Sequence, residues 1–125
     1  MSDKRQSLGK QGEALAVAYL IRLGYRILRT NYRCRLGEID IIAEEKGTLV
    51  FVEVKCRSSK AFGEPYEAVT RTKMLQMSKV ALDYLSRRNL YGKSARFDVV
   101  SVKLLDDNQP GIELIRNAFD LHYGK

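Results

Sequence analysis

Apolar and polar residues alternate along residues 37–43 and 49–55, which predicts two neighbouring β-strands. The connection between them is short and polar and contains a glycine, as a tight turn requires. Because side chains on a strand point to alternate faces, the first strand is predicted to place Ile39 and Ile41 on one face and Asp40 on the other.

The second strand is predicted to be covered on both faces. One face would carry Leu49, Phe51, Glu53 and Lys55, and the other Val50, Val52, Val54 and Cys56. Branched apolar residues at this density are typical of a central strand, where an unpaired charge is costly to bury. An isolated acid and lysine two residues apart are ordinarily a surface ion pair of little energetic value. Here the apolar surroundings of Asp40, Glu53 and Lys55 favour a functional role instead.

The remaining pattern predicts two helices and further strands. A helix is expected over 7–23, with Ser7 as its N-cap and Gly24 as its C-cap, and a second from residue 66 or 70 to residue 88. Strands are expected over 25–33, 95–102 and 112–116, with a loop over 56–65 and a turn over 106–111. This order predicts an α/β fold with a mixed sheet, and the length predicts a single domain over residues 1–125.

One glycine and one acid stand out in the first predicted helix. Gly12 lies in the helix interior, where glycine costs about 1 kcal/mol relative to alanine, so we expect a strand or a ligand to pass close by. Glu13 follows it directly. By itself, Glu13 would be interpreted as a surface residue, paired with Lys10 or with no partner.

The net charge of +7 is distributed unevenly. Residues 36–54 carry five acidic residues and one lysine, whereas residues 1–35 and 55–96 are strongly basic. An acidic segment between basic flanks favours a metal site on a surface that binds nucleic acid. The alternative is that the basic residues serve only solubility.

Basic residues near the predicted strands are candidate phosphate contacts. These are Arg26, Arg29, Arg33 and Arg35 in the first strand region and Arg57 in the loop that follows the second central strand. Tyr32 could stack on a base or sugar beside them. Equally, Tyr32 could belong to the core and the arginines to a solvated face.

The cysteine and histidine content argues against some classes of protein. Cys34 and Cys56 form no Cys-x-x-Cys pair and His122 is the single histidine, which argues against a zinc site of the usual Cys/His type and against a disulfide. No apolar run is long enough to cross a membrane, and the N-terminus lacks the apolar core of a secretory signal. We therefore expect a cytoplasmic protein with no membrane partner.

Asp40 and Glu53 would converge at the ends of neighbouring strands. Two converging carboxylates require a cation between them, and Mg²⁺ (or Mn²⁺) is the usual ion for oxygen ligands. The ammonium group of Lys55 could then orient or activate a water molecule near that ion. The residues present need no Ser, Cys or His nucleophile.

Two motifs carry a resemblance to a known family. Gly-Glu-Ile-Asp-Ile-Ile at 37–42 and Phe-Val-Glu-Val-Lys at 51–55 resemble the YraN-like family of small bacterial proteins, within the PD-(D/E)xK nuclease superfamily. Gly12-Glu13, Gly24-Tyr25, Asn31-Tyr32-Arg33 and Lys73 also match the family's pattern. The family is similar to archaeal Holliday-junction resolvases. Ile39 stands where the superfamily's proline is expected; that proline ligates nothing.

The resemblance implies a restriction-endonuclease-like fold, with a central mixed sheet of about five strands flanked by helices. It implies that Asp40 and Glu53 bind Mg²⁺, together with the backbone carbonyl of Val54. Lys55 would orient the attacking water and neutralise charge developing on the phosphate. Glu13 would be an outer ligand or water-binding residue, and Lys73 would contact the scissile phosphate or its neighbour.

These residues predict a metal-dependent endonuclease, with branched or structured DNA as one class of substrate. Two alternatives stay open: a non-catalytic nucleic-acid-binding module that keeps the nuclease fold, and a small subunit whose basic faces bind an acidic protein. Retention of Asp40, Glu53 and Lys55 together favours the enzyme. Resolvase-like proteins are typically dimers, so a homodimer is a further partner arrangement that the resemblance raises.

Overall fold

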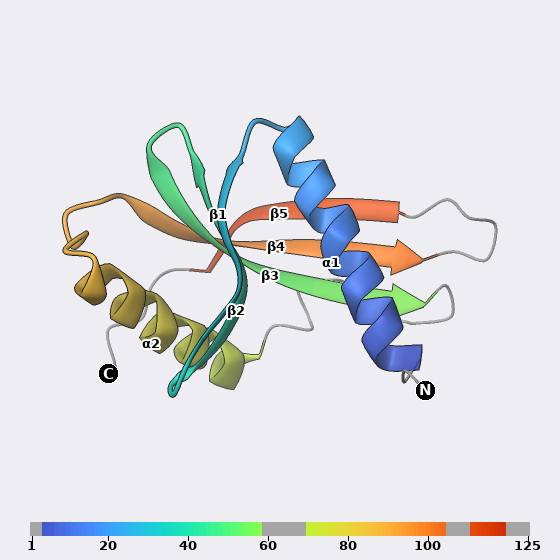
Figure 1. Ribbon diagram of the computed structural model, residues 1–125, viewed down its shortest axis with the longest axis horizontal. Coiled ribbons are helices and arrows are strands. Elements are labelled where there is room, and N and C mark those ends of the chain that lie inside the picture. Colours follow the sequence, from blue (N-terminus) through green and yellow to red (C-terminus); the bar gives the residue numbers. More distant parts are fainter. Residues whose placement is uncertain (1–3, 59–69, 105–110, 120–125) are drawn as a thin grey trace.

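The computed structural model describes residues 4–58, 70–104 and 111–119, which form two helices and five strands (Figure 1). In chain order these are α1 (Lys4–Arg22), β1 (Arg26–Cys34), β2 (Gly37–Glu45), β3 (Thr48–Ser58), α2 (Arg71–Arg87), β4 (Ala95–Leu104) and β5 (Gly111–Phe119). The predicted α/β class and mixed central sheet are confirmed.

The five strands form one sheet in the order β1-β2-β3-β4-β5. Strands β3 and β4 are parallel, from Leu49 opposite Ala95 to Ser58 opposite Leu104, and the other neighbours are antiparallel. A parallel pair needs a crossover connection, and α2 lies within that crossover. The fold therefore holds β3, the strand with the predicted charged residues, between β2 and β4.

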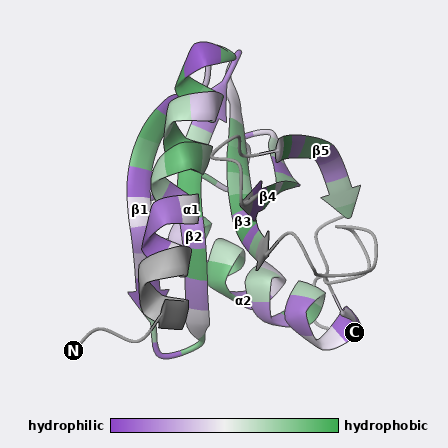
Figure 2. Cartoon of the chain, turned by 90° about the vertical axis from the view of Figure 1, so that its right-hand side faces the viewer, coloured by the Kyte–Doolittle hydropathy of each residue, from purple (hydrophilic) through white to green (hydrophobic). Residues whose placement is uncertain are grey.

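Each face of the sheet is covered by one helix, which gives two apolar clusters (Figure 2). The cluster on the α1 side includes Ala16, Leu20, Ile41, Ala43, Val50, Val52, Val100 and Val102. The cluster on the α2 side includes Tyr32, Ile39, Ile42, Leu49, Phe51, Met77, Val80, Tyr84 and Phe97. Val50 and Val52 on one side and Leu49 and Phe51 on the other confirm the predicted two faces of β3.

The helix ends explain where the chain changes direction. Helix α1 begins at Lys4, so the predicted N-cap at Ser7 is wrong. The end of α1 is as predicted: Gly24 has φ +97°, and the Tyr25 amide donates to the Leu20 carbonyl at 3.0 Å. At α2, Thr70 is the N-cap and its hydroxyl accepts a hydrogen bond from the Lys73 amide at 3.1 Å. Of the two predicted starts, residue 70 is therefore correct.

Strand β2 departs from simple alternation at Asp40. Ile39 belongs to the cluster on the α2 side and Ile41 to the cluster on the α1 side, so the prediction that they share a face is wrong. The partner strand is irregular at the same level: Asn31 has φ +53° between Thr30, which pairs with Ile41, and Tyr32, which pairs with Ile39. Asparagine tolerates this left-handed conformation better than most residues.

The observed strand boundaries also bear on the predicted loop over 56–65 and the predicted turn over 106–111. Strand β3 continues to Ser58, so residues 56–58 are strand and not loop as predicted. Residues 59–65 of that predicted loop, and all but the last residue of the predicted turn over 106–111, lie outside the described residues. Gly111 opens β5.

Gly12 has the close neighbour that its position in a helix predicts. A β-carbon on Gly12 would lie 1.9 Å from the Cys56 sulfur, closer than two such atoms can approach. Glycine therefore lets α1 pack directly on β3. This contact fixes Glu13, the next residue of α1, beside the C-terminal half of β3.

Candidate active site where strands β2 and β3 separate

Asp40 lies at the point where the β2–β3 ladder ends. The strands pair from Glu45 opposite Thr48 to Ile41 opposite Val52. Beyond that pair, the Val54 amide donates a hydrogen bond to Asp40 Oδ2 at 2.8 Å. The Asp40 carboxylate thus accepts a hydrogen bond from a β3 amide at the point where the described backbone pairing of β2 and β3 ends. This bond holds Asp40 against β3.

Glu53 is the buried acid of the site, with 4% of its surface exposed. Lys55 Nζ and Lys73 Nζ each lie 3.4 Å from Glu53 Oε2. Lys55 comes from β3 and Lys73 from the first turn of α2, which Thr70 caps. Two ammonium groups from separate elements therefore meet one buried carboxylate, and both keep about 30% of their side chains exposed.

Glu53 lies close enough to Asp40 to oppose the ionisation of Asp40. Burial and the negative charge of Glu53 raise the pKa of Asp40 to about 7, although the hydrogen bond from the Val54 amide works in the opposite direction. Glu13 contributes a smaller repulsion. A cation placed between the carboxylates would relieve this repulsion.

Glu13 approaches the site from α1. Its Oε1 accepts a hydrogen bond from Asn31 Nδ2 at 2.8 Å, so its partner is on β1 and not the lysine considered above. Burial, Asp40 and Glu13 raise the pKa of the Cys56 thiol, which keeps this sulfur protonated and a poor metal ligand. The oxygen atoms of the carboxylates are therefore the donors that the site offers.

The donor set fits a hard divalent ion held by few protein ligands. Among the described residues, no group of three or more His, Cys, Asp and Glu side chains is arranged to hold a metal ion. Mg²⁺ does not need such a group, because it usually keeps several waters and binds proteins through one or two carboxylates. Asp40 and Glu53, with the nearby carbonyl of Val54, match that requirement.

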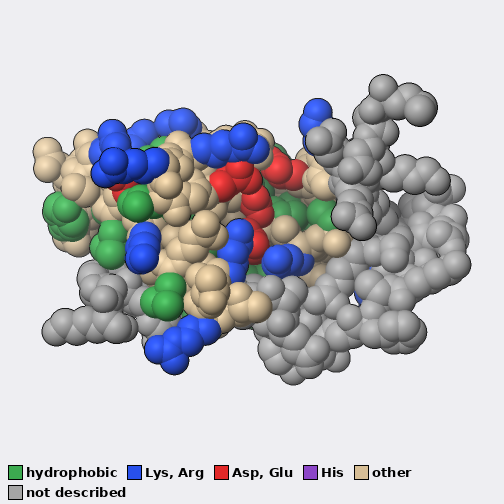
Figure 3. All heavy atoms as spheres, turned by 90° about the horizontal axis from the view of Figure 1, so that it is seen from below, with side chains coloured by type: hydrophobic (Ala, Val, Ile, Leu, Met, Phe, Trp, Pro, Cys, Tyr) green, Lys and Arg blue, Asp and Glu red, His purple; other side chains and the backbone are tan. Residues whose placement is uncertain are grey.

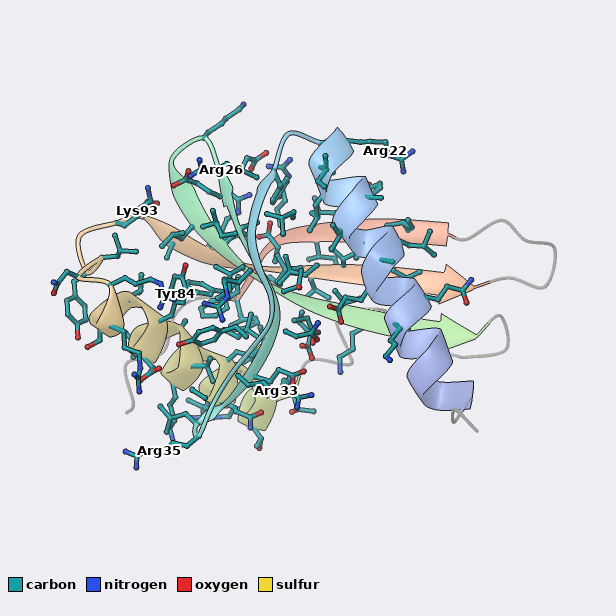
Figure 4. The ribbon with its side chains drawn as sticks, viewed as in Figure 1. Arg22, Arg26, Arg33, Arg35, Tyr84 and Lys93 are labelled. Carbon is teal, nitrogen blue, oxygen red and sulfur yellow. The ribbon has the colours of Figure 1, made fainter. Side chains whose placement is uncertain are left out.

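The other predicted nucleic-acid contacts are spread over the surface. Arg33 pairs with Glu38 and its side chain is 77% exposed. Arg35 lies in the turn between β1 and β2 and points away from the body of the protein (Figure 4). The backbone of Arg57 belongs to β3, opposite Lys103, and its side chain lies outside the description. Of the predicted contacts whose side chains the structure describes, Lys73 is the one that reaches Glu53.

Tyr32 belongs to the core, which decides between the two alternatives left open for it. Its exposed fraction is 5%, and its ring packs edge-on against Tyr84 with centroids 5.3 Å apart. Its hydroxyl donates to Asp83 of α2 at 3.3 Å. The guanidinium of Arg29 lies 5.3 Å from the ring centroid and covers the remaining edge of this cluster.

A second charged cluster, at the other end of β2, was not predicted. Asp98 is fully buried and accepts hydrogen bonds from the Tyr25 hydroxyl at 2.8 Å and from Arg96 Nε at 3.0 Å. Arg96 also donates to Glu45 at 2.5 Å, and Arg116 donates to the same Glu45 oxygen at 2.7 Å. Burial opposes ionisation of Glu45, but these two hydrogen bonds outweigh it and hold its pKa below the ordinary value.

This second cluster is fully paired and ties strands together. Burial and the Asp98 hydrogen bond raise the pKa of Tyr25 to about 12, so its hydroxyl stays a donor. Within the described residues, no buried side-chain nitrogen or oxygen lacks a hydrogen-bond partner. The cluster is structural. An Arg-x-Asp pair inside the apolar strand β4 was the sequence signal that could have revealed it.

Basic side chains lie near acidic ones on one face of the protein. Figure 3 shows acidic side chains near the middle of one face with Lys and Arg side chains on several sides of them. A polyanion could therefore approach the acids while its phosphates contact cations. In the part of the chain that the structure describes, neither helix has the length and apolar character needed to cross a membrane.

Comparison with known proteins finds one family and close relatives. The model of a family described as uncharacterised protein family UPF0102 matches residues 12–102. A UPF0102 protein of Syntrophus aciditrophicus is 53% identical over 117 residues, which cover 94% of this chain and 91% of that protein. UPF0102 proteins of Geobacter sulfurreducens and Moorella thermoacetica are 50% and 48% identical, over 98% and 95% of this chain and 95% and 100% of their own lengths.

Proposed function

The chain belongs to the uncharacterised protein family UPF0102, and we propose that it is a metal-dependent nuclease that hydrolyses phosphodiester bonds of nucleic acid. One observation carries the proposal. Two acids on neighbouring strands, Asp40 and Glu53, share one small site with the ammonium groups of Lys55 and Lys73. Carboxylates for a cation and ammonium groups for a phosphate are the groups that this reaction needs.

Asp40 and Glu53 would hold the ion, with the Val54 carbonyl as a third oxygen donor. When bound, Mg²⁺ would supply Lewis-acid polarisation of the phosphate and lower the pKa of water. The hydrogen bond from the Val54 amide keeps Asp40 in place, because it fixes one carboxylate oxygen on β3. The burial of Glu53 keeps the second acid from rotating into solvent.

The two lysines would act on the substrate. Lys55 Nζ and Lys73 Nζ each lie 3.4 Å from the same Glu53 oxygen, and each keeps part of its side chain in solvent. In this role Lys55 orients the attacking water and stabilises negative charge in the transition state. Lys73, which α2 presents from its first turn, contacts a phosphate oxygen.

DNA is the proposed polymer, and the PD-(D/E)xK superfamily is the proposed relationship. The net charge of +7 and the basic surface around the acids support a polyanionic substrate. The order of an acid on one strand and Glu-x-Lys on the next supports the superfamily placement. Asp40, Glu53, Val54 and Lys55 supply that motif.

The proposal is tested by variants that separate the roles of Glu53 and Lys55. Glu53→Gln removes a negative ligand, so both Mg²⁺ affinity and cleavage should collapse while metal-free binding of nucleic acid persists. Lys55→Ala should keep most of the metal affinity and lose cleavage about a hundredfold or more, the scale of losing one transition-state stabiliser. Lys79→Ala, at an exposed lysine of α2, is the matched control and should cleave as wild type.

A different set of results would support a non-catalytic binding module. If wild type and both variants bind nucleic acid alike, show no metal effect and cleave nothing, the acids do not form a catalytic site. Calorimetric titration with Mg²⁺ and cleavage of labelled DNA, measured on the same preparations, distinguish these outcomes.

A further inference from the structure

A pocket of about 400 Å³ lies between α1 and β1. It is lined by Lys10, Glu13, Ala14, Val17, Asn31 and Arg33. None of these side chains has a role in the proposed cleavage except Glu13. The pocket volume is near the lower end of the range for small-molecule sites, about 300–1,000 Å³, and suits one nucleotide unit.

The pocket adjoins the candidate active site through both of its walls. On β1, Asn31 lies between Thr30 and Tyr32, the residues that pair with Ile41 and Ile39 of β2. Asn31 is therefore at the same height in the sheet as Asp40. On α1, Glu13 follows Gly12, which packs against Cys56, the neighbour of Lys55 on β3. A strand of nucleic acid that reached Asp40 would thus pass this pocket.

The pocket has basic groups at its rim and apolar groups in its wall. Lys10 and Arg33 are exposed, and Arg33 contacts Glu38 through Nε, which leaves its guanidinium edge accessible to an anion. Ala14 and Val17 present methyl groups one turn apart on α1. Such a surface can hold a phosphate and pack against the sugar attached to it.

The one acid of the pocket is already engaged. Asn31 Nδ2, from β1, donates to Glu13 Oε1, on α1, at 2.8 Å. The hydrogen bond holds the Glu13 side chain at the side of the pocket and reduces the repulsion between Glu13 and an incoming phosphate. Lys10 and Arg33 thus bring two positive charges against the one carboxylate that lines the pocket, so the lining favours an anionic group.

We propose that this pocket binds the nucleotide next to the one cleaved, with its phosphate between Lys10 and Arg33 and its sugar against Ala14 and Val17. The inference rests on the proposed nuclease function for its position relative to the cleaved bond. Its binding chemistry is independent of cleavage. The substrate class that it selects is a single strand or a locally opened end, because a pocket of this size admits one nucleotide unit.

The test is a binding experiment on the full chain, in EDTA, with single-stranded tetrathymidylate as the probe. Amide chemical shifts of the ¹⁵N-labelled protein should change at residues 10–17 and 31–33 as the probe is added. Lys10→Glu should weaken binding about tenfold, since it removes one phosphate contact and adds repulsion. Lys79→Glu makes the same change of charge on α2 and should change affinity less than about twofold.

Two results would overturn the inference: shift changes confined to other surfaces, or equal affinity in the two charge-reversal variants. The readout requires no cleavage. A protein that binds the probe in this pocket and cleaves nothing contradicts the nuclease proposal and supports the pocket as a nucleotide site. A protein that cleaves DNA but shows no shifts in the pocket contradicts the inference alone.

Discussion

Replacing Asp40 with asparagine should stabilise the metal-free protein at neutral pH. The substitution keeps an oxygen that can accept the hydrogen bond from the Val54 amide, and it removes the charge that burial and Glu53 oppose. Most substitutions at partly buried polar residues destabilise a protein, so a gain in stability is a distinctive outcome. Such a gain would show that the folded protein keeps the Asp40 and Glu53 carboxylates close together despite the electrostatic repulsion between them.

The magnitude follows from the pKa of Asp40, which is raised from 3.8 to about 7. About three pKa units at about 1.4 kcal/mol each give a ceiling of about 4 kcal/mol, and we expect about 1–3 kcal/mol because asparagine keeps the Val54 hydrogen bond but not the full burial match of the acid. The folded-state pKa lies above the unfolded value, so the contribution of Asp40 to the stability of the wild type is most favourable below pH 4. That contribution is lost as the pH rises to about 7. Asparagine does not titrate.

The assay is urea denaturation of both proteins in EDTA at pH 4 and pH 8. The difference in unfolding free energy should be small at pH 4 and reach its full value at pH 8. Glu113→Gln, at an exposed acid of β5, removes the same charge elsewhere and should leave the difference near zero at both pH values. A wild type that is more stable than Asp40→Asn at pH 8, without metal, would refute the reasoning.

Two further predictions concern packing. Asp98→Ala should cost about 3–5 kcal/mol in urea denaturation because it removes one of the two carboxylates that pair with the partly buried Arg96 and leaves the Tyr25 hydroxyl and the Asn117 amide without their acceptor. Asp83→Ala, at an acid of α2 that keeps 19% of its side chain exposed, should cost about 1 kcal/mol. Equal losses would contradict a structural role for the buried cluster. Gly12→Ala should destabilise the protein by about 1–3 kcal/mol, because the new methyl group meets the Cys56 sulfur. Adding Cys56→Ala to the same chain removes that sulfur and should recover most of the loss. A double variant no more stable than Gly12→Ala would show that another contact is responsible.

The pair of central strands could be predicted because local sequence determines it. Alternation over residues 49–56 assigned both faces of β3 correctly, since this strand is regular and packs on both sides. Gly24 marked the end of the first helix through its backbone chemistry, and residue 70 was one of the two starts considered for the second. Gly12 in the helix interior predicted a close neighbour, and Cys56 is that neighbour.

What could not be predicted depends on contacts between distant segments. The faces of Ile39 and Ile41 follow from the irregular pairing opposite Asn31. The bond between Asp40 and the Val54 amide exists only once β2 and β3 are paired. The burial of Tyr32 depends on α2, which follows it in the chain by about forty residues. Alternation along one strand carries no information about these partners.

The buried cluster around Asp98 shows the same limit. Tyr25 lies between α1 and β1, Glu45 ends β2, and the other members come from β4 and β5, so no short motif contains the cluster. From the sequence, Glu53 is given a functional role as a charged residue in an apolar strand, but Asp98, which is also a charged residue in an apolar strand, is given none. The structure separates the two cases, because Asp98 is fully paired by protein groups whereas Asp40 and Glu53 repel each other.

Metal-dependent cleavage tests the central claim most directly. Purified wild-type protein is incubated with labelled single-stranded, duplex and four-way-junction DNA and structured RNA, with Mg²⁺, Mn²⁺ or EDTA, beside Asp40→Asn prepared in the same way. We predict that wild type cleaves at least one DNA substrate with Mg²⁺ or Mn²⁺ and none in EDTA, and that Asp40→Asn loses this activity. Absence of cleavage on every substrate, or equal cleavage by the variant, would contradict the assignment of Asp40 and Glu53 as a nuclease site.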